Sequence, residues 1–207
     1  MDCNCPTPSA LTAIPTQDCE VNLNQVQRMA FQRIATGNQF GTNALPAAND
    51  ITVLADWQAR ITATDATKIV VTPFIGANPI IEAGDAITNG GGDNSTLNGV
   101  EEVEGVNPSR FSTEFKGLAP AIEKAMKTLM CEKNLQVYFF LQGGKIAVVE
   151  IDANNQKGFK AESVFFSDRN NAGFATKDTH NMSFALPAGW SENLKIITPA
   201  FNPLTEL

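Results

Sequence analysis

The chain has 207 residues, of which 43% are apolar and 13 are phenylalanine, so it can bury a sizeable core in one domain or two small ones. Only 18% of the residues are charged, below the roughly 25% typical of soluble proteins, and we expect such a neutral polar surface to pack against copies of itself. The formal net charge of −7 argues against a protein that coats nucleic acid, which needs lysine and arginine to displace phosphate counterions.

The sequence contains no apolar run of about 18 residues, so we expect no membrane span. The first residues form neither a basic n-region nor an apolar h-region, which predicts synthesis in a cytoplasm, where cysteines are usually reduced.

The first 50 residues are predicted to form an N-terminal arm and a helix. Residues 1–21 are rich in proline, threonine and cysteine, which is typical of an extended arm. Residues 22–35 have apolar side chains at helical spacing, with Asn22 as a possible cap and Gly37 as a stop. The sequence therefore predicts an N-terminal helix before the main domain.

Residues 51–200 are predicted to form one β-rich domain. Short strand-like runs cover residues 51–55, 57–63 and 68–75, and Arg110–Phe115 alternates like a strand. Residues 83–108 form the longest segment without a strand or helix pattern, and loops of this length are usually functional or mobile. We expect this acidic, glycine-rich segment to be an assembly loop, with candidate residues Gly90, Gly91, Gly92, Asp93, Glu101, Glu102 and Glu104.

A helix and a tight hairpin are predicted at the centre of this domain. Residues 119–133 carry one apolar stripe at 3.6 residues per turn. Two apolar runs, 135–141 and 145–151, flank Gly143 and Gly144, and Gly-Gly supplies the positive φ of a hairpin turn. Further strands are predicted at 159–166, 182–186 and 194–198, and 201–207 as an extended tail.

These patterns predict a mainly β (α+β) fold. We expect an antiparallel β-sandwich or barrel with one core-flanking helix, one N-terminal helix, extended terminal arms and a long loop.

Four cysteines offer a possible zinc site, namely Cys3, Cys5, Cys19 and Cys131. Four thiolates can close a structural zinc site, but such sites favour paired C-x₂₋₄-C knuckles, and only a C-x-C half is present. Cys131 is expected on the apolar side of the central helix, where a buried cysteine is common. A zinc site and incidental cysteines both remain open.

The sequence shows no motif typical of an enzyme. The glycine-rich loop lacks the Gly-Lys-Ser/Thr of a phosphate-binding loop, and its acidic neighbours would repel phosphate. Asp85, Asp93, Asn94 and Glu101 supply oxygen donors of the kind that bind calcium, but they lack EF-hand spacing. His180 is the only histidine and is expected in a loop, and a nucleophilic triad would also need a positioned nucleophile.

Three stretches together resemble virion structural proteins of tailed bacteriophages that infect Bacteroidetes, including crAss-like phages. They are the cysteine-rich arm running into 24–33, the segment 99–105 followed by 111–115, and residues 129–138 with their hairpin. Within that group, tail tube subunits look closest. The resemblance implies a compact β domain with a flanking helix, stacking as rings through loops and arms, and no catalytic residues.

The resemblance gives one leading hypothesis: a self-assembling, non-enzymatic tail tube subunit without a cofactor. It implies a homo-oligomeric ring of six or more copies in the virion, assembled in the host cytoplasm. Other virion proteins would be partners, and DNA would pass through the lumen without specific binding. A head–tail connector or neck ring protein and a capsid decoration protein are close alternatives, and a zinc-stabilised binding module is a third.

Overall fold

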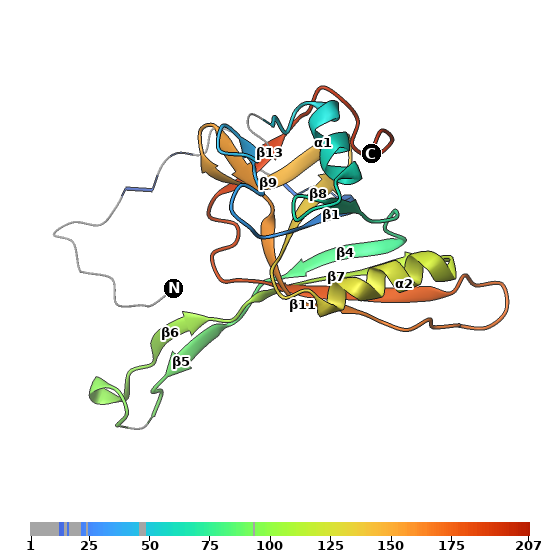
Figure 1. Cartoon of the computed structure of the whole chain (residues 1–207). Coiled ribbons are helices and arrows are strands. Elements are labelled where there is room, and N and C mark those ends of the chain that lie inside the picture. The colour runs from blue at the N-terminus through green and yellow to red at the C-terminus, as the bar shows by residue number, and fades with distance from the viewer. Residues whose placement is uncertain (1–12, 15, 17–21, 24, 46–48, 93) are drawn as a thin grey trace.

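The computed structural model describes residues 13–14, 16, 22–23, 25–45, 49–92 and 94–207. Its body is mainly β, and all recorded strand pairs in these residues are antiparallel (Figure 1). The elements are β1 (Val26–Arg33), β2 (Phe40–Gly41), α1 (Leu54–Thr62), β3 (Ile69–Val71), β4 (Ala77–Glu82), β5 (Ala86–Asn89), η1 (Leu97–Gly99), β6 (Glu102–Val106), β7 (Ser109–Lys116), α2 (Pro120–Thr128), η2 (Leu129–Cys131), β8 (Leu135–Leu141), β9 (Lys145–Asp152), β10 (Asn155–Lys157), β11 (Phe159–Phe166), β12 (Thr179–Leu186) and β13 (Leu194–Ile197).

Two sheets share the strand β11. The first sheet contains β3, β1, β8, β9 and β13, with β10 beside β9 and β2 beside β10; the second runs β11-β12-β7-β4. Residues 159–161 of β11 pair with β8, and its later residues pair with β12. Within the pairing with β12 the register shifts between Glu162 and Phe165, where Ser163 has a φ of 52°. A bulge therefore lets one strand pass between two packed sheets, and the fold is a sandwich rather than a closed barrel.

The main core lies between the two sheets and is rich in aromatic rings. Phe111 stacks on Phe184 with 4.8 Å between ring centroids, and Phe139 of the opposite sheet lies 5.3 Å from Phe111. All three side chains are fully buried. Aromatic packing of this kind contributes beyond the area that it buries.

A second core covers the outer face of the first sheet. Trp57 of α1 is fully buried and lies 5.3 Å from Tyr138 and 5.4 Å from Phe140. Every residue of β8 is buried, because its odd residues face the main core and its even residues face this second one. The central strand thus has no solvent face, which is why its sequence is almost continuously apolar.

The helix α2 covers the part of the second sheet that lies beyond the first sheet (Figure 1). Met126 and Leu129 join the main core with Phe115, Phe166 and Met182. The predicted central helix is confirmed as α2 with the 3₁₀ turn η2, although Ile122 and Met130 of the predicted stripe are about 40% exposed. The hairpin of β8 and β9 is also confirmed.

The predicted N-terminal helix is wrong. Residues 26–33 form the strand β1, which pairs with β8 along its whole length and with β3 on its other edge. Met29, Ala30 and Phe31 are buried together because both faces of β1 are covered, and a strand buried on both faces has no alternation. The segment therefore belongs to the main sheet.

Two predicted strands, at 51–55 and 57–63, are also wrong. Residues 54–62 form α1, whose buried side chains Trp57 and Arg60 are three residues apart on one helical face. The prediction for 68–75 holds only over β3, and the chain beyond it runs along β1, where Thr72 donates its N–H to the Met29 carbonyl.

The C-terminal residues 201–207 form turns on the second core rather than an extended tail. Phe201, Leu204 and Leu207 pack there, and Arg28 donates hydrogen bonds to the carbonyls of Leu204 and Leu207. These seven residues are therefore part of the body.

Candidate assembly surfaces

The residues expected to form a long loop form a projecting two-stranded hairpin instead. β5 pairs with β6, and this ribbon continues the pairing of β4 with β7 in the second sheet. It leaves the body at Gly84 and Asn107, where the Asn107 N–H donates to the Asp85 carbonyl over 2.9 Å. Figure 1 shows the hairpin pointing away from the body. We call residues 85–106 the arm.

The arm exposes apolar side chains on both faces. Val103 and Val106 are about half exposed and share a face with Thr88 and Ala86, their cross-strand partners. Ile87 is 44% exposed on the opposite face, where it lies over Gly105. Strands of a folded body normally bury one face, so the arm, with apolar side chains exposed on both faces, is a candidate contact surface.

The arm is also strongly acidic. Its sequence contains no lysine or arginine and carries five carboxylates: Asp85, Asp93, Glu101, Glu102 and Glu104. Side chains of the two strands are joined near the tip, where Asn89 donates to the Glu104 carboxylate over 2.9 Å. The arm therefore combines apolar surface with negative charge.

The structure brings Gly90, Gly91, Gly92 and Glu101 to the distal end of the arm, and it places Glu102 and Glu104 on the strand β6. Gly90, Gly91 and Gly92 have φ values of 89°, 88° and 126°, which only glycine adopts easily. Gly91 donates its N–H to the Gly99 carbonyl, which closes the tip near Glu101, and Asp93 lies outside the described residues. Leu97, beside these glycines, is 81% exposed.

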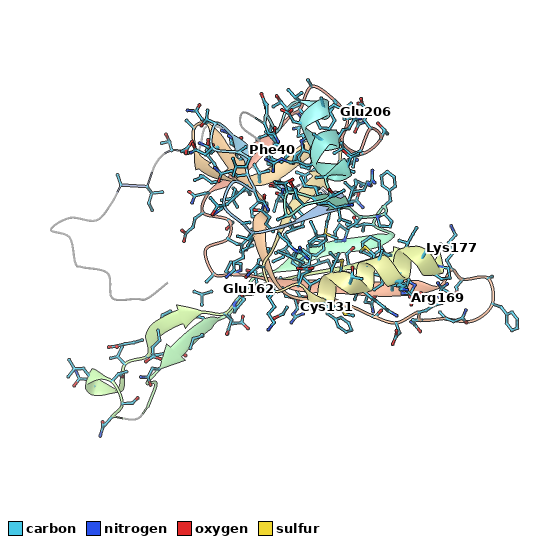
Figure 2. All side chains as sticks on the ribbon, in the orientation of Figure 1. Phe40, Cys131, Glu162, Arg169, Lys177 and Glu206 are labelled. Carbon is cyan, nitrogen blue, oxygen red and sulfur yellow. The ribbon has the colours of Figure 1, made fainter. Side chains whose placement is uncertain are left out.

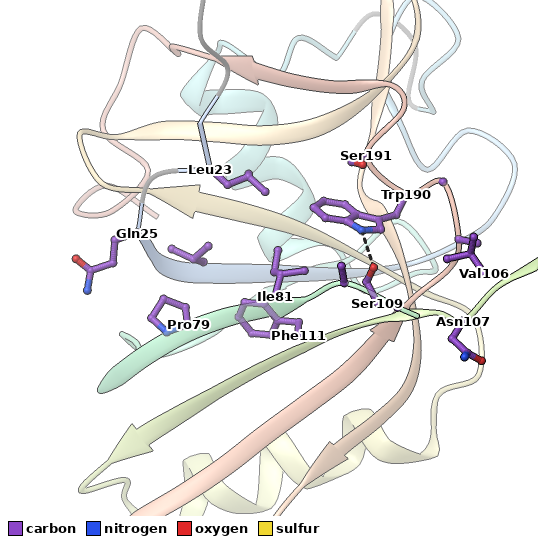
Figure 3. A pocket seen from close by; sticks show the side chains of 15 residues that line it. Leu23, Gln25, Pro79, Ile81, Val106, Asn107, Ser109, Phe111, Trp190 and Ser191 are labelled. Carbon is purple, nitrogen blue, oxygen red and sulfur yellow. Dashed lines mark hydrogen bonds between the residues drawn. The ribbon is translucent and has the colours of Figure 1, made fainter. Parts of the chain in front are cut away.

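A pocket of about 500 Å³ lies at the base of the arm (Figure 3). Trp190 closes one side and donates its indole N–H to the Ser109 hydroxyl over 3.2 Å. Phe111 and Ile81 line the pocket, and so does Leu23, which precedes β1 in the chain. The residues that line the pocket carry no charged side chain: Leu23, Gln25, Val26, Pro79, Ile81, Ala83, Gly84, Val106, Asn107, Ser109, Phe111, Ala188, Gly189, Trp190 and Ser191.

At the opposite end of the second sheet, ion pairs fix the loop 167–178 to α2. Arg169 bridges Glu123 and Asp178 at 3.1 Å each and donates to the Leu118 carbonyl. Lys127 bridges Glu123 at 2.8 Å and Asp168 at 2.5 Å. Figure 2 labels Arg169 and Lys177 beside one end of the helix. The loop is thus fixed by several charged contacts.

The charges in this network shift the acidity of its members. The Lys127 ammonium, and then the Arg169 guanidinium, lower the pKa of Glu123 below its ordinary value. Hydrogen bonds from Asn171, followed by those from Arg169, lower the pKa of Asp178. Both carboxylates are therefore held in their ionised form.

His180 is a core residue, which corrects the expectation of a loop histidine. It is a buried residue of β12 that stacks on Phe166 with 5.3 Å between centroids. Its Nδ1 lies 3.4 Å from the Ser167 carbonyl, and its Nε2 lies 3.7 Å from a Glu123 oxygen. The ring packs beneath α2. Among the described residues, no serine, threonine or cysteine side chain is hydrogen-bonded to it.

The cysteine site is only partly visible. Cys131 is exposed, not on the apolar side of the helix, because the 3₁₀ turn η2 directs Leu129 into the core instead. Cys3, Cys5 and Cys19 lie outside the described residues. Within the part of the chain that the structure describes, no cluster of three or more histidine, cysteine, aspartate or glutamate side chains could hold a metal ion.

The fold and its surfaces define a class of protein: an antiparallel β-sandwich with a flanking helix and a projecting acidic arm. Comparison with protein-family models, with curated proteins and with solved structures gave no match. No helix of the described residues is long and apolar enough to cross a membrane.

The sequence did not predict the pocket or the anchored loop. The pocket joins Leu23, Ile81 and Trp190, which are far apart in the chain, and no local pattern links them. Phe174 follows Asn-Asn-Ala-Gly, a composition typical of loops, and this was the only signal that the loop displays an aromatic side chain.

Proposed function

We propose that this protein is a self-assembling structural subunit of a tailed-phage virion, and that it is a tail tube protein. The observation that carries the proposal is the arm, a two-stranded ribbon that leaves the body and exposes apolar side chains on both faces. A rigid sandwich that holds such an arm is suited to repeated contacts between identical subunits.

The energetics of the arm support a role in assembly. A two-stranded hairpin is marginally stable in water when it packs on nothing. Ile87, Val103 and Val106 are each 44–50% exposed, so contact with a neighbouring subunit would remove apolar surface from water. β5 and β6 form a sheet of only two strands, so each has an outer edge to which a strand of a neighbouring subunit can add hydrogen bonds.

Charge supports the tail tube in particular. The net charge of −7 and the five carboxylates of the arm disfavour binding of the DNA phosphate backbone. A lumen through which DNA passes must not retain it, and a protein without a phosphate-neutralising surface meets that need. We infer rings of six or more copies, made in the host cytoplasm and built into the virion with other virion proteins. We infer no enzymatic role.

The resemblance also covers a head–tail connector or neck ring and a capsid decoration protein. These differ in the assembly that they form: a tube protein stacks its rings, whereas a neck ring stays single and a decoration protein needs a capsid.

Electron microscopy of the purified full chain separates these functions. Stacked rings or tubes are the expected result. Single rings at every concentration would favour a neck ring protein. Binding of the purified chain only to assembled capsids would favour a capsid decoration protein. A monomer that neither assembles nor binds virion components would contradict the proposal.

A further inference from the structure

We propose that copies of this chain join head to tail, with Phe174 of one copy inserted into the pocket at the arm base of the next. This contact rests on the proposed self-assembly and specifies its interface.

Phe174 is displayed by an ordered loop. Its side chain is fully exposed, more so than any other large apolar side chain in the described residues. Asn171 accepts from the Gly173 N–H and donates to Asp178, and Thr176 donates to the Gly173 carbonyl. Gly173 and Ala175 on either side have φ values of 100° and 61°. A fixed loop loses little conformational entropy when its aromatic tip is bound.

The pocket fits such a tip in polarity and size. It has about 500 Å³, within the usual range for small binding sites. Phe111, Ile81 and Trp190 offer apolar and aromatic walls. The loop tip, residues 170–176, has no charged side chain, and neither does the lining of the pocket. No ion would be buried without a partner on either side.

The tip and the pocket lie at opposite ends of the same strand. The loop enters β12 at Thr179, and pocket residues Ala188 and Trp190 follow its other end at Leu186. An eight-residue strand spans roughly 27 Å at about 3.4 Å per residue. Phe174 therefore cannot reach the pocket of its own chain without breaking the sheet. The contact must be made between copies, and a head-to-tail contact generates rings or open filaments.

Charge on the two sides of the contact is complementary. The arm, with five carboxylates, begins at the wall of the pocket formed by Gly84, Val106 and Asn107. The loop that carries Phe174 is followed by the exposed Lys177, which lies against Gly117, and Lys124 is exposed on the adjacent α2. The carboxylates at this end, Glu123, Asp168 and Asp178, are paired with Lys127 and Arg169. When Phe174 enters the pocket, the acidic arm of the receiving copy meets this lysine-bearing end. Such pairing favours the correct orientation.

The test uses two full-length variants with opposite defects. Phe174→Ser removes the tip, and Ala188→Phe fills the pocket while keeping the tip. Each alone is expected to weaken self-association, measured by sedimentation velocity, by about tenfold or more, the effect of losing a buried aromatic anchor. The matched control is Phe165→Ser, which changes another exposed phenylalanine, 51% exposed on β11 between the two ends. It is expected to assemble like the unmodified chain.

Mixing the two variants gives the sharpest result. The tip of Ala188→Phe can enter the open pocket of Phe174→Ser, so a one-to-one heterodimer that grows no further is expected. Failure to form it, or unchanged assembly of both single variants, would overturn the contact while leaving self-assembly in place. A monomeric unmodified chain would overturn both this contact and the proposed function. If deleting residues 1–21 abolished assembly and Phe174→Ser did not, the pocket would instead belong to the N-terminal segment.

Discussion

Gly84 and Asn107 face each other at the base of the arm so closely that a Cβ on Gly84 would stand 1.8 Å from the Asn107 carbonyl oxygen. No side chain fits there, so the backbone must move if glycine is replaced. The relationship fixes the direction in which the arm leaves the body.

Gly84→Ala should therefore turn or loosen the arm and weaken assembly, while the sandwich stays folded. Thermal unfolding by circular dichroism checks the body, and sedimentation velocity checks assembly. Gly105→Ala is the control within the same arm, because a Cβ there would meet only the Ile87 side chain at an ordinary 3.8 Å. Equal assembly of both variants would mean that the direction of the arm does not matter.

Deleting Gly90–Asn98 should leave a folded subunit that assembles poorly. The deletion removes the exposed Leu97 but keeps Gly99–Glu101 as a three-residue connection, a common hairpin length. Because the described residues of this segment belong to neither core, the free energy of unfolding should change by about 0.5 kcal/mol or less. Normal ring or tube formation by this variant in electron micrographs would show that the tip is only a surface excursion.

The ion pairs under the loop 167–178 should make stability depend on pH in the acid range. Glu123 and Asp178 have folded-state pKa values below their ordinary 4.5 and 3.8, because cations and hydrogen bonds favour their ionised forms. The unfolded chain therefore takes up protons first as pH falls. The stabilisation is fully present above about pH 4.5 and is lost as pH falls through the lowered values.

Glu123→Gln should flatten this dependence, as measured by urea unfolding at a series of pH values below 6. Glu101→Gln, an exposed carboxylate of the arm, serves as the control and should keep the slope of the unmodified chain. If Glu123→Gln kept the full slope, the network would not couple the loop to folding.

Trp57→Ala should destabilise the body most strongly among single changes in the second core. The side chain is fully buried, contacts Phe40, Tyr138 and Phe140, and donates its indole N–H to the Ile51 carbonyl. Its removal leaves a cavity, and such losses cost about 3–5 kcal/mol. Phe174→Ala, at a fully exposed aromatic residue, should cost about 0.5 kcal/mol or less in the same urea titration.

The sequence predicted the elements whose apolar residues follow a simple pattern, either one stripe of a helix or one continuous run of a strand. α2 has one buried face, and its stripe reveals it; β8 and β9 are continuous apolar runs around Gly143 and Gly144. β1 was predicted wrongly as a helix because Leu23, Val26, Ala30 and Ile34 stand at helical spacing, although Val26 and Ala30 belong to a strand that is covered on both faces. In α1, a nine-residue helix, two buried side chains were too few to mark a stripe.

The acidic, glycine-rich segment 83–108 is visible in the sequence, but its structure is not. The sequence predicts a loop, whereas the structure pairs β5 with β6, because neither strand has a core face to reveal alternation. The pocket and the Phe174 loop depend on tertiary contacts, including Trp190 with Ser109 and Arg169 with Glu123. Neither pair has a local signature in the chain.

The central claim is that this chain assembles with copies of itself, and the mass of the purified full chain in solution tests it most directly. Sedimentation velocity from nanomolar to high micromolar concentration should show species that grow from the 22.2 kDa monomer into rings or longer stacks. A single 22.2 kDa species over the whole range, with the body shown to be folded, would contradict the account.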